Sequence, residues 1–168
     1  MQVTPSFIEI QHTASLPETT FLKALEEGKL LGARTRHGRD GQPGKVYFPP
    51  KEADPATGLE LDEFIELPDR GGTVTTFAII NIPFPGGQRI KPPYVAAYVL
   101  LDGADIPFLH LVVEIDPADV RMGMRVQAVW KPREEWGSGY RQHRLLQAHR
   151  RAGCRLRLLQ APPVKGPN

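Results

Sequence analysis

The chain has 168 residues, of which 40% are hydrophobic and 24% are charged, and its formal net charge is +2. This length suits one globular domain with at most a small appended module. No run of about 18 apolar residues occurs, so the sequence offers no transmembrane helix, and its N-terminus lacks the pattern of a secretory signal. Cys154 is the single cysteine, which excludes a disulfide framework and a cysteine-ligated zinc site. We therefore expect a cytoplasmic protein.

The first predicted element is a short helix that Ser15 or Thr19 can cap and that Gly28 can end. Phe21 and Leu25 belong to one apolar stripe at helical spacing. This stripe either packs on its own domain or docks on a partner protein.

Glycine and proline are frequent in residues 34–58, which predicts loops around one short strand, residues 45–48. Without cysteines this stretch cannot form a stable metal-binding knuckle. We expect it to be held by the residues around Tyr47 and Phe48.

From residue 59 onward the pattern is typical of β-strands. Residues 94–101 are apolar on both faces, as expected of a central strand covered on both sides. In residues 108–115, alternation places Leu109, Leu111, Val113 and Ile115 on one face and His110 and Glu114 on the other. A helical turn capped by Asp116 precedes the last strand. The predicted strands are residues 61–67, 73–82, 94–101, 108–115 and 124–131.

Five short strands with one helical turn predict a compact antiparallel barrel, for which an OB-type barrel fits best. No phosphate-binding loop and no nucleophile motif are present, and nothing assembles a nucleophile, a base and an orienting group. The sequence therefore disfavours an enzyme that acts alone. An OB-fold nucleic-acid binder needs exposed aromatics and a basic groove. The strands offer few such residues, with Arg89 and Lys91 as the two cations between them.

The charge is divided between an acidic body and a basic tail. Residues 137–168 hold six arginines, one lysine and no acidic residue, whereas the rest of the chain holds 14 basic and 19 acidic side chains. We therefore predict three parts. They are residues 1–58 with the helix and a ribbon, residues 59–136 with the barrel, and the tail 137–168.

The stretch VEIDPADVRMGMRVQAVW, residues 113–130, resembles the family of zinc-ribbon and OB-fold proteins known as domain of unknown function 35, which associate with acyl-CoA enzymes. FLKALEEGKLLGAR, VYFPP, and GTVTTFAIINIP with PPYVAAYVLLDG agree in the same order. The resemblance implies a mainly β fold, in which an N-terminal helix and a rubredoxin-like ribbon precede a five-stranded OB-fold barrel. Zinc-binding members carry cysteine pairs beside the Phe-Pro-Pro element. Here Asp54 and Thr57 stand at the downstream cysteine positions and His37 lies upstream, so we expect a metal-free ribbon and no cofactor.

Members that act in actinobacterial steroid side-chain degradation resemble this chain most. The resemblance implies a non-catalytic subunit, required by a lipid-transfer-protein-like aldolase of the thiolase superfamily, in a heterotetramer. That carbon–carbon lyase cleaves a 17-hydroxy steroid CoA thioester to a 17-keto steroid and propionyl-CoA, and a MaoC-like hydratase is a further implied partner. One alternative is a scaffold that links a thiolase to another acyl-CoA or polyketide enzyme. A less favoured one is an OB-fold nucleic-acid binder, whereas we expect neither membrane nor nucleic acid among the partners.

Rigid, apolar, proline-rich segments are candidate contacts with a partner or a substrate channel. Alternatively, these residues only plug the ends of the barrel. Arg89 and Lys91 are candidates to attract a CoA phosphate. The candidate contact residues are Phe21, Leu25, Tyr47, Phe48, Pro49, Ile82, Phe84 and Tyr94.

The tail segment YRQHRLLQAHRRAGCRLRLLQ, residues 140–160, departs from the acidic, tyrosine-rich ending that the family shows after WKPREEWG. Codons can be chosen for residues 140–164 so that the same DNA, read one base later, encodes that acidic ending. In this second reading frame, a stop codon falls inside Val164–Lys165. We therefore hypothesise a one-base shift near Gly137 and expect a mobile tail. The gene sequence over these codons tests the hypothesis.

Overall fold

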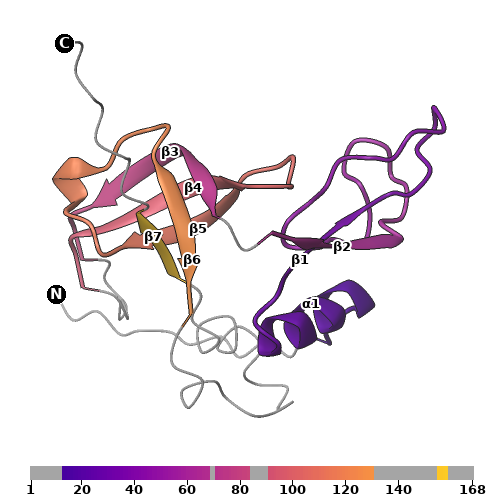
Figure 1. Cartoon of the computed structure of the whole chain (residues 1–168), viewed down its shortest axis with the longest axis horizontal. Helices are drawn as coiled ribbons and strands as arrows, with labels where there is room; N and C mark the ends of the chain where they lie inside the picture. The colour runs from indigo at the N-terminus through magenta and orange to yellow at the C-terminus, as the bar shows by residue number, and fades with distance from the viewer. Residues whose placement is uncertain (1–12, 69–70, 84–90, 131–154, 159–168) are drawn as a thin grey trace, which may run out of the picture.

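The computed structural model describes residues 13–68, 71–83, 91–130 and 155–158, and it divides them between a barrel and a smaller unit beside it (Figure 1). The smaller unit contains the helix and the first two strands. The elements are α1 (Leu16–Glu26), β1 (Leu30–Arg34), β2 (Glu63–Leu67), β3 (Gly72–Ile80), β4 (Tyr94–Leu101), β5 (Phe108–Val113), the 3₁₀ turn η1 (Pro117–Asp119), β6 (Arg125–Val129) and β7 (Arg155–Leu158).

Helix α1 begins after Ser15, the first of the two caps that the sequence allowed, rather than after Thr19. Ser15 is its N-cap, and the Ser15 side chain and backbone exchange hydrogen bonds with Glu18 in a capping box. Gly28, with φ of 78°, follows the C-terminal end. The helix buries Phe21 and Leu25. No helix among the described residues is long and apolar enough to cross a membrane.

The predicted strand 61–67 does not join the barrel. Its residues form β2, which pairs antiparallel with β1, from Leu30 opposite Leu67 to Arg34 opposite Glu63. The strand itself was predicted correctly, but its assignment to the barrel was wrong. The sequence did not reveal β1, which is the strand that pairs with β2.

The predicted strand 45–48 is reduced to one bridge, in which Tyr47 pairs with Ala33. The neighbouring backbone groups of Val46 bind elsewhere. The Val46 N–H donates to the Asp105 carboxylate at 2.8 Å, and the Asp105 N–H donates to the Val46 carbonyl at 2.9 Å. The Val46 groups point away from β1, so these two bonds join the loop to the turn between β4 and β5.

The barrel is closed, with strand order β3-β4-β5-β7-β6. Strand β3 pairs antiparallel with β4 and β6, whereas β5 and β7 run parallel. The predicted mainly β fold with an OB-type barrel is confirmed, but its fifth strand is β7 rather than residues 61–67. Strand β7 is the one described segment of residues 137–168, so the mobile tail and the reading-frame hypothesis stay predictions.

One hydrophobic core runs from the helix into the barrel. Phe48 packs edge-on against Phe21 of α1, with ring centroids 5.5 Å apart, and against Phe108 of β5, with centroids 4.8 Å apart. The same core contains the fully buried Val74 and Val126 of the barrel. Phe48 therefore joins the helix and the barrel through a loop that has no regular structure of its own.

Candidate partner-binding surface

The register between β4 and β5 decides which side chains face out of the barrel. Val95, Ala97 and Val99 of β4 are buried, and Ala97 lies opposite His110. Directly opposed residues in an antiparallel pair lie on the same face of the sheet. His110 therefore lies on the inner face with Phe108, next to which its ring packs edge-on.

The alternating residues Leu109 and Leu111 consequently face outward. The sequence separated them correctly from His110 but did not indicate which of the two faces is buried. After the strand, Glu114 adopts φ of 61° and breaks the alternation, so Ile115 packs against the core instead of sharing the outward face.

We call the outward surface of β3, β4 and β5 the outer sheet face. One row across the strands consists of Thr76, Tyr98 and Leu109, and the next row contains Ala96 and Leu111. The exposed fractions of Tyr98 and Leu109 are 45% and 59%, which are high for large side chains in the middle of strands. The outer sheet face comprises Thr76, Ala78, Ile80, Tyr94, Ala96, Tyr98, Leu109 and Leu111.

No charged side chain belongs to the three strands of the outer sheet face, which the Arg125–Asp102 ion pair borders at Thr73. The described strands β3, β4 and β5 contain no lysine, arginine, aspartate or glutamate. Isolated apolar residues are common on protein surfaces, whereas a contiguous apolar patch marks an interaction site. The sequence predicted that strand 94–101 is covered on both sides, yet the described chain leaves Tyr98 open to solvent. We therefore regard this face as the candidate interface.

Four of the predicted contact residues lie in the core. Phe21, Leu25, Tyr47 and Phe48 are 5–6% exposed, so they have almost no surface to offer a partner. Their burial disfavours the assignment as contacts with a partner or a substrate channel, which stays a prediction. The alternative that the helix stripe packs on its own domain describes the structure better, because Phe48 needs Phe21 and Phe108 as neighbours.

The remaining predicted contacts are scattered. Pro49 is half-buried, Ile82 is 79% exposed beyond the end of β3, and Tyr94 lies on the outer sheet face. Lys91 is exposed. Phe84 and Arg89 lie outside the described residues, so a phosphate site formed with Lys91 stays a prediction. Tyr98 and Leu109 were missed, although three successive uncharged strands were a signal of an unusual outer surface.

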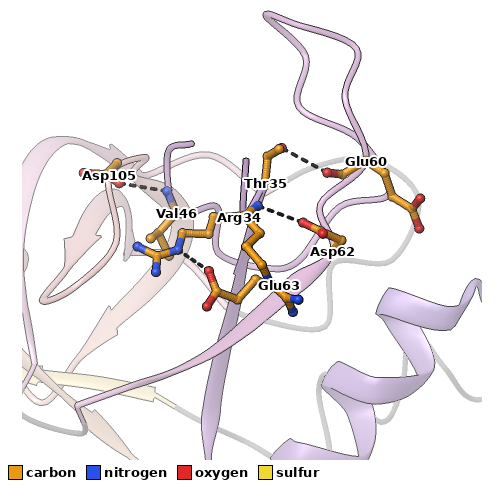
Figure 2. Close-up of polar contacts among 8 residues, drawn as sticks. Arg34, Thr35, Val46, Glu60, Asp62, Glu63 and Asp105 are labelled. Carbon is orange, nitrogen blue, oxygen red and sulfur yellow. Dashed lines mark hydrogen bonds and ion pairs between the residues drawn. The ribbon is translucent and has the colours of Figure 1, made fainter. Parts of the chain in front are cut away.

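Polar contacts hold the smaller unit together, and one pair joins it to the barrel (Figure 2). The Arg34 guanidinium donates to the Glu63 carboxylate at 2.6 Å, which lowers the pKa of Glu63 and raises that of Arg34. The Asp62 carboxylate accepts the Arg36 backbone N–H at 2.8 Å, and this bond lowers the pKa of Asp62. Together with the Val46–Asp105 pair, these contacts hold β1, β2 and the β4–β5 turn in one arrangement.

We expect stability to fall in acid. The pKa values of Glu63, Asp62 and Asp102 are lowered by hydrogen bonds, in the case of Asp102 from Arg125. A lowered pKa in the folded state means that the unfolded chain binds more protons, so this stabilisation is present above the ordinary carboxylate range, around pH 4, and is lost below it. Urea midpoints between about pH 7 and pH 3 measure the loss. Glu63→Gln should show a smaller acid-dependent fall than wild type, and an equal fall would contradict the assignment.

The zinc that the resemblance associates with the ribbon does not fit the residues present. Among the described residues, no group of three or more histidine, cysteine, aspartate or glutamate side chains could hold a metal ion. At the downstream position, both Asp54 carboxylate oxygens already accept hydrogen bonds, from the Tyr47 hydroxyl, the Ala56 N–H and the Thr57 hydroxyl. Hydrogen-bond donors therefore surround the Asp54 carboxylate, whereas a metal ion bound to it would need additional lone-pair ligands nearby.

The fold and the surface define an OB-fold barrel with a helix and a two-stranded unit packed beside it. Residues 65–131 match the family model described as the C-terminal OB-fold domain of ChsH2. A DUF35 domain-containing scaffold protein of Methanocaldococcus jannaschii is 35% identical over 110 residues, which are 64% of this chain and 72% of that protein. The chain belongs to the DUF35 family.

Two solved structures share the fold. A DUF35-family protein of unknown function from Sulfolobus solfataricus superposes with a TM-score of 0.53 at 14% identity, over 68% of this chain and 78% of that one. A chain of the Ltp2–ChsH2(DUF35) aldolase superposes with a TM-score of 0.53 at 21% identity, over 72% of this chain and 88% of that one. At these identities the likeness extends to the fold alone.

Proposed function

We propose that this chain is a non-catalytic subunit that binds a thiolase-like aldolase subunit through the outer sheet face. The observation that carries the proposal is the uncharged face of β3, β4 and β5, on which Tyr98 and Leu109 are exposed. An exposed tyrosine on a face without charge is typical of the centre of a protein interface, where aromatic residues are enriched and charged residues are depleted. The partner supplies the catalytic residues in this arrangement.

The kind of partner is supported by the comparisons. The Methanocaldococcus jannaschii relative is described as a scaffold protein, and the fold recurs in the Ltp2–ChsH2(DUF35) aldolase. The finer proposal, based on the sequence resemblance, is a heterotetramer that cleaves a 17-hydroxy steroid CoA thioester to a 17-keto steroid and propionyl-CoA, with a MaoC-like hydratase as neighbour.

A second candidate is a scaffold between a thiolase and another acyl-CoA enzyme. The scaffold description of the Methanocaldococcus jannaschii relative favours it. This function requires two separate docking surfaces, whereas an aldolase subunit requires one. Nucleic-acid binding is disfavoured because the outer sheet face carries no cation to contact phosphates.

Substitutions on the outer sheet face test the proposal. The chain is co-expressed with a thiolase-like aldolase subunit, and both the Kd of the complex and the steroid retro-aldol activity are measured. Leu109→Lys and Leu109→Asp should each weaken the complex at least about tenfold, because either charge must be desolvated at the interface. A charged partner surface would attract one of these two introduced charges and repel the other. Weaker binding by both variants therefore indicates the loss of an apolar contact.

Met122→Lys is the matched control, because Met122 is 68% exposed but lies outside the three strands. It should leave the Kd unchanged. Wild-type affinity for both Leu109 variants would overturn the proposal. Two further results would do the same. One is a homodimer of this chain that the Leu109 variants dissociate, and the other is protection of the face by another segment of the same chain.

A further inference from the structure

The Asp54 carboxylate is a buried charge at the centre of a small polar cluster. Asp54 is 7% exposed. Its Oδ1 atom accepts the Tyr47 hydroxyl at 2.7 Å and the Ala56 N–H at 2.9 Å, and its Oδ2 atom accepts the Thr57 hydroxyl at 2.8 Å. Burial of a carboxylate is unfavourable unless hydrogen bonds compensate for the lost water, and here both oxygens are compensated. We call these four residues the Asp54 cluster.

The Asp54 cluster connects three parts of the smaller unit. Tyr47 exchanges two backbone hydrogen bonds with Ala33 of β1, at 2.8 and 3.0 Å, while its hydroxyl binds Asp54. The turn after Asp54 closes through the Gly58 N–H, which donates to the Asp54 carbonyl at 2.8 Å. From the upstream loop, the Arg39 guanidinium donates to the Thr57 carbonyl at 3.0 Å. The Asp54 carboxylate itself binds groups of Tyr47, Ala56 and Thr57. Through the backbone of Tyr47 and the carbonyl of Thr57, this cluster is connected to β1 and to the upstream loop.

A structural zinc ion organises a ribbon in the same way, because its ligands come from two separate turns and fix those turns to each other. Asp54 and Thr57 stand at the downstream positions where zinc-binding relatives, by the resemblance, carry cysteines. We propose that the Asp54 carboxylate replaces the metal ion as the organising centre of this ribbon, with hydroxyl and amide donors in place of a metal–ligand shell. The inference rests on the Asp54 cluster and on the resemblance to zinc-ribbon proteins, and it does not depend on the proposed function.

This replacement has a chemical consequence. Zinc-bound thiolates release their metal to chelators and in acid, because the ligands must stay deprotonated. A hydrogen-bonded carboxylate has no metal to lose and no thiol to oxidise. The smaller unit should therefore keep its fold when the metal supply fails or when oxidants are present.

Amide hydrogen exchange on the full chain tests the proposal. Asp54→Asn keeps the size of the side chain but removes its charge and replaces one acceptor oxygen by a donor. We expect the amides of Ala56 and Gly58 to exchange roughly tenfold faster, because local opening of the turn becomes easier. The amide of Val74, which donates to the Met124 carbonyl in the barrel, serves as the internal reference and should stay unchanged.

Substitutions at Thr57 keep the proposal testable if Asp54→Asn does not fold. Thr57→Val removes the hydroxyl at nearly constant volume and should accelerate exchange of the same amides, whereas Thr57→Ser retains the hydroxyl and should not. Wild-type protein treated with EDTA should exchange as before. Unchanged exchange in Asp54→Asn and Thr57→Val would overturn the proposal. So would faster exchange after EDTA, or bound zinc in stoichiometric amount in the purified protein.

Discussion

Gly71→Ala is expected to prevent the barrel from closing. Gly71 has φ of 111°, a conformation that residues with a Cβ atom rarely adopt. A Cβ atom at this position would lie 2.1 Å from the Val126 carbonyl oxygen and 3.2 Å from its carbonyl carbon. Both are backbone atoms of β6, so no side-chain rotation can relieve the overlap. The site lies immediately before β3, where that strand meets β6.

The expected loss of stability exceeds about 4 kcal/mol, which is large for a single substitution. Gly123→Ala provides the matched control, because Gly123 also has positive φ, 84°, but an added Cβ atom would meet nothing within 4 Å. It should cost only the backbone strain, about 1–2 kcal/mol. Urea unfolding followed by circular dichroism gives both values. Similar midpoints for the two variants would refute the steric explanation.

Phe48→Ala should cause the second large loss, of about 3–5 kcal/mol, as expected for an aromatic ring removed from a core. Its ring contacts both Phe21 of α1 and Phe108 of β5, so the cavity would lie where the helix, the loop and the barrel meet. Both edge-to-face contacts are lost with the ring, in addition to the buried area.

Met122→Ala is the corresponding control, since Met122 is exposed and should change stability by less than about 0.5 kcal/mol. Differential scanning calorimetry on Phe48→Ala also tests whether the helix and the barrel unfold together. A separate, earlier transition of the smaller unit is the expected result. A single transition at the wild-type temperature would show that Phe48 does not join the two parts.

The elements that the sequence predicted well depend on local signals. The capping box at Ser15 lies within one turn of helix. Strands β4 and β6 are continuous segments whose residue patterns can be recognised without knowing which strands they pair with. The short strand β1 was missed because its pairing partner, β2, lies some 30 residues away, as Arg34 opposite Glu63 illustrates. Strand pairing across such a distance leaves little trace in either segment alone.

The candidate surface was harder to predict than the fold, because alternation separates two faces without stating which one is buried. His110 is turned inward by its position opposite Ala97, and this register is a property of two strands together. Likewise, the sequence predicted that Tyr47 and Phe48 form a rigid apolar contact segment. In the structure Tyr47 binds Asp54 and Phe48 packs on Phe108, so both residues are buried. Long-range partners decided the outcome in both cases.

The uncharged outer sheet face also bears on how the cell must produce this protein. Water-exposed apolar β-surface promotes self-association, and natural sheets usually carry charges that prevent it. A copy of this chain without the proposed partner leaves Tyr98 and Leu109 uncovered. Excess chains would then be lost to aggregation or to proteases. Under the proposed function, this face requires balanced synthesis of the chain and its partner, for example from one transcript.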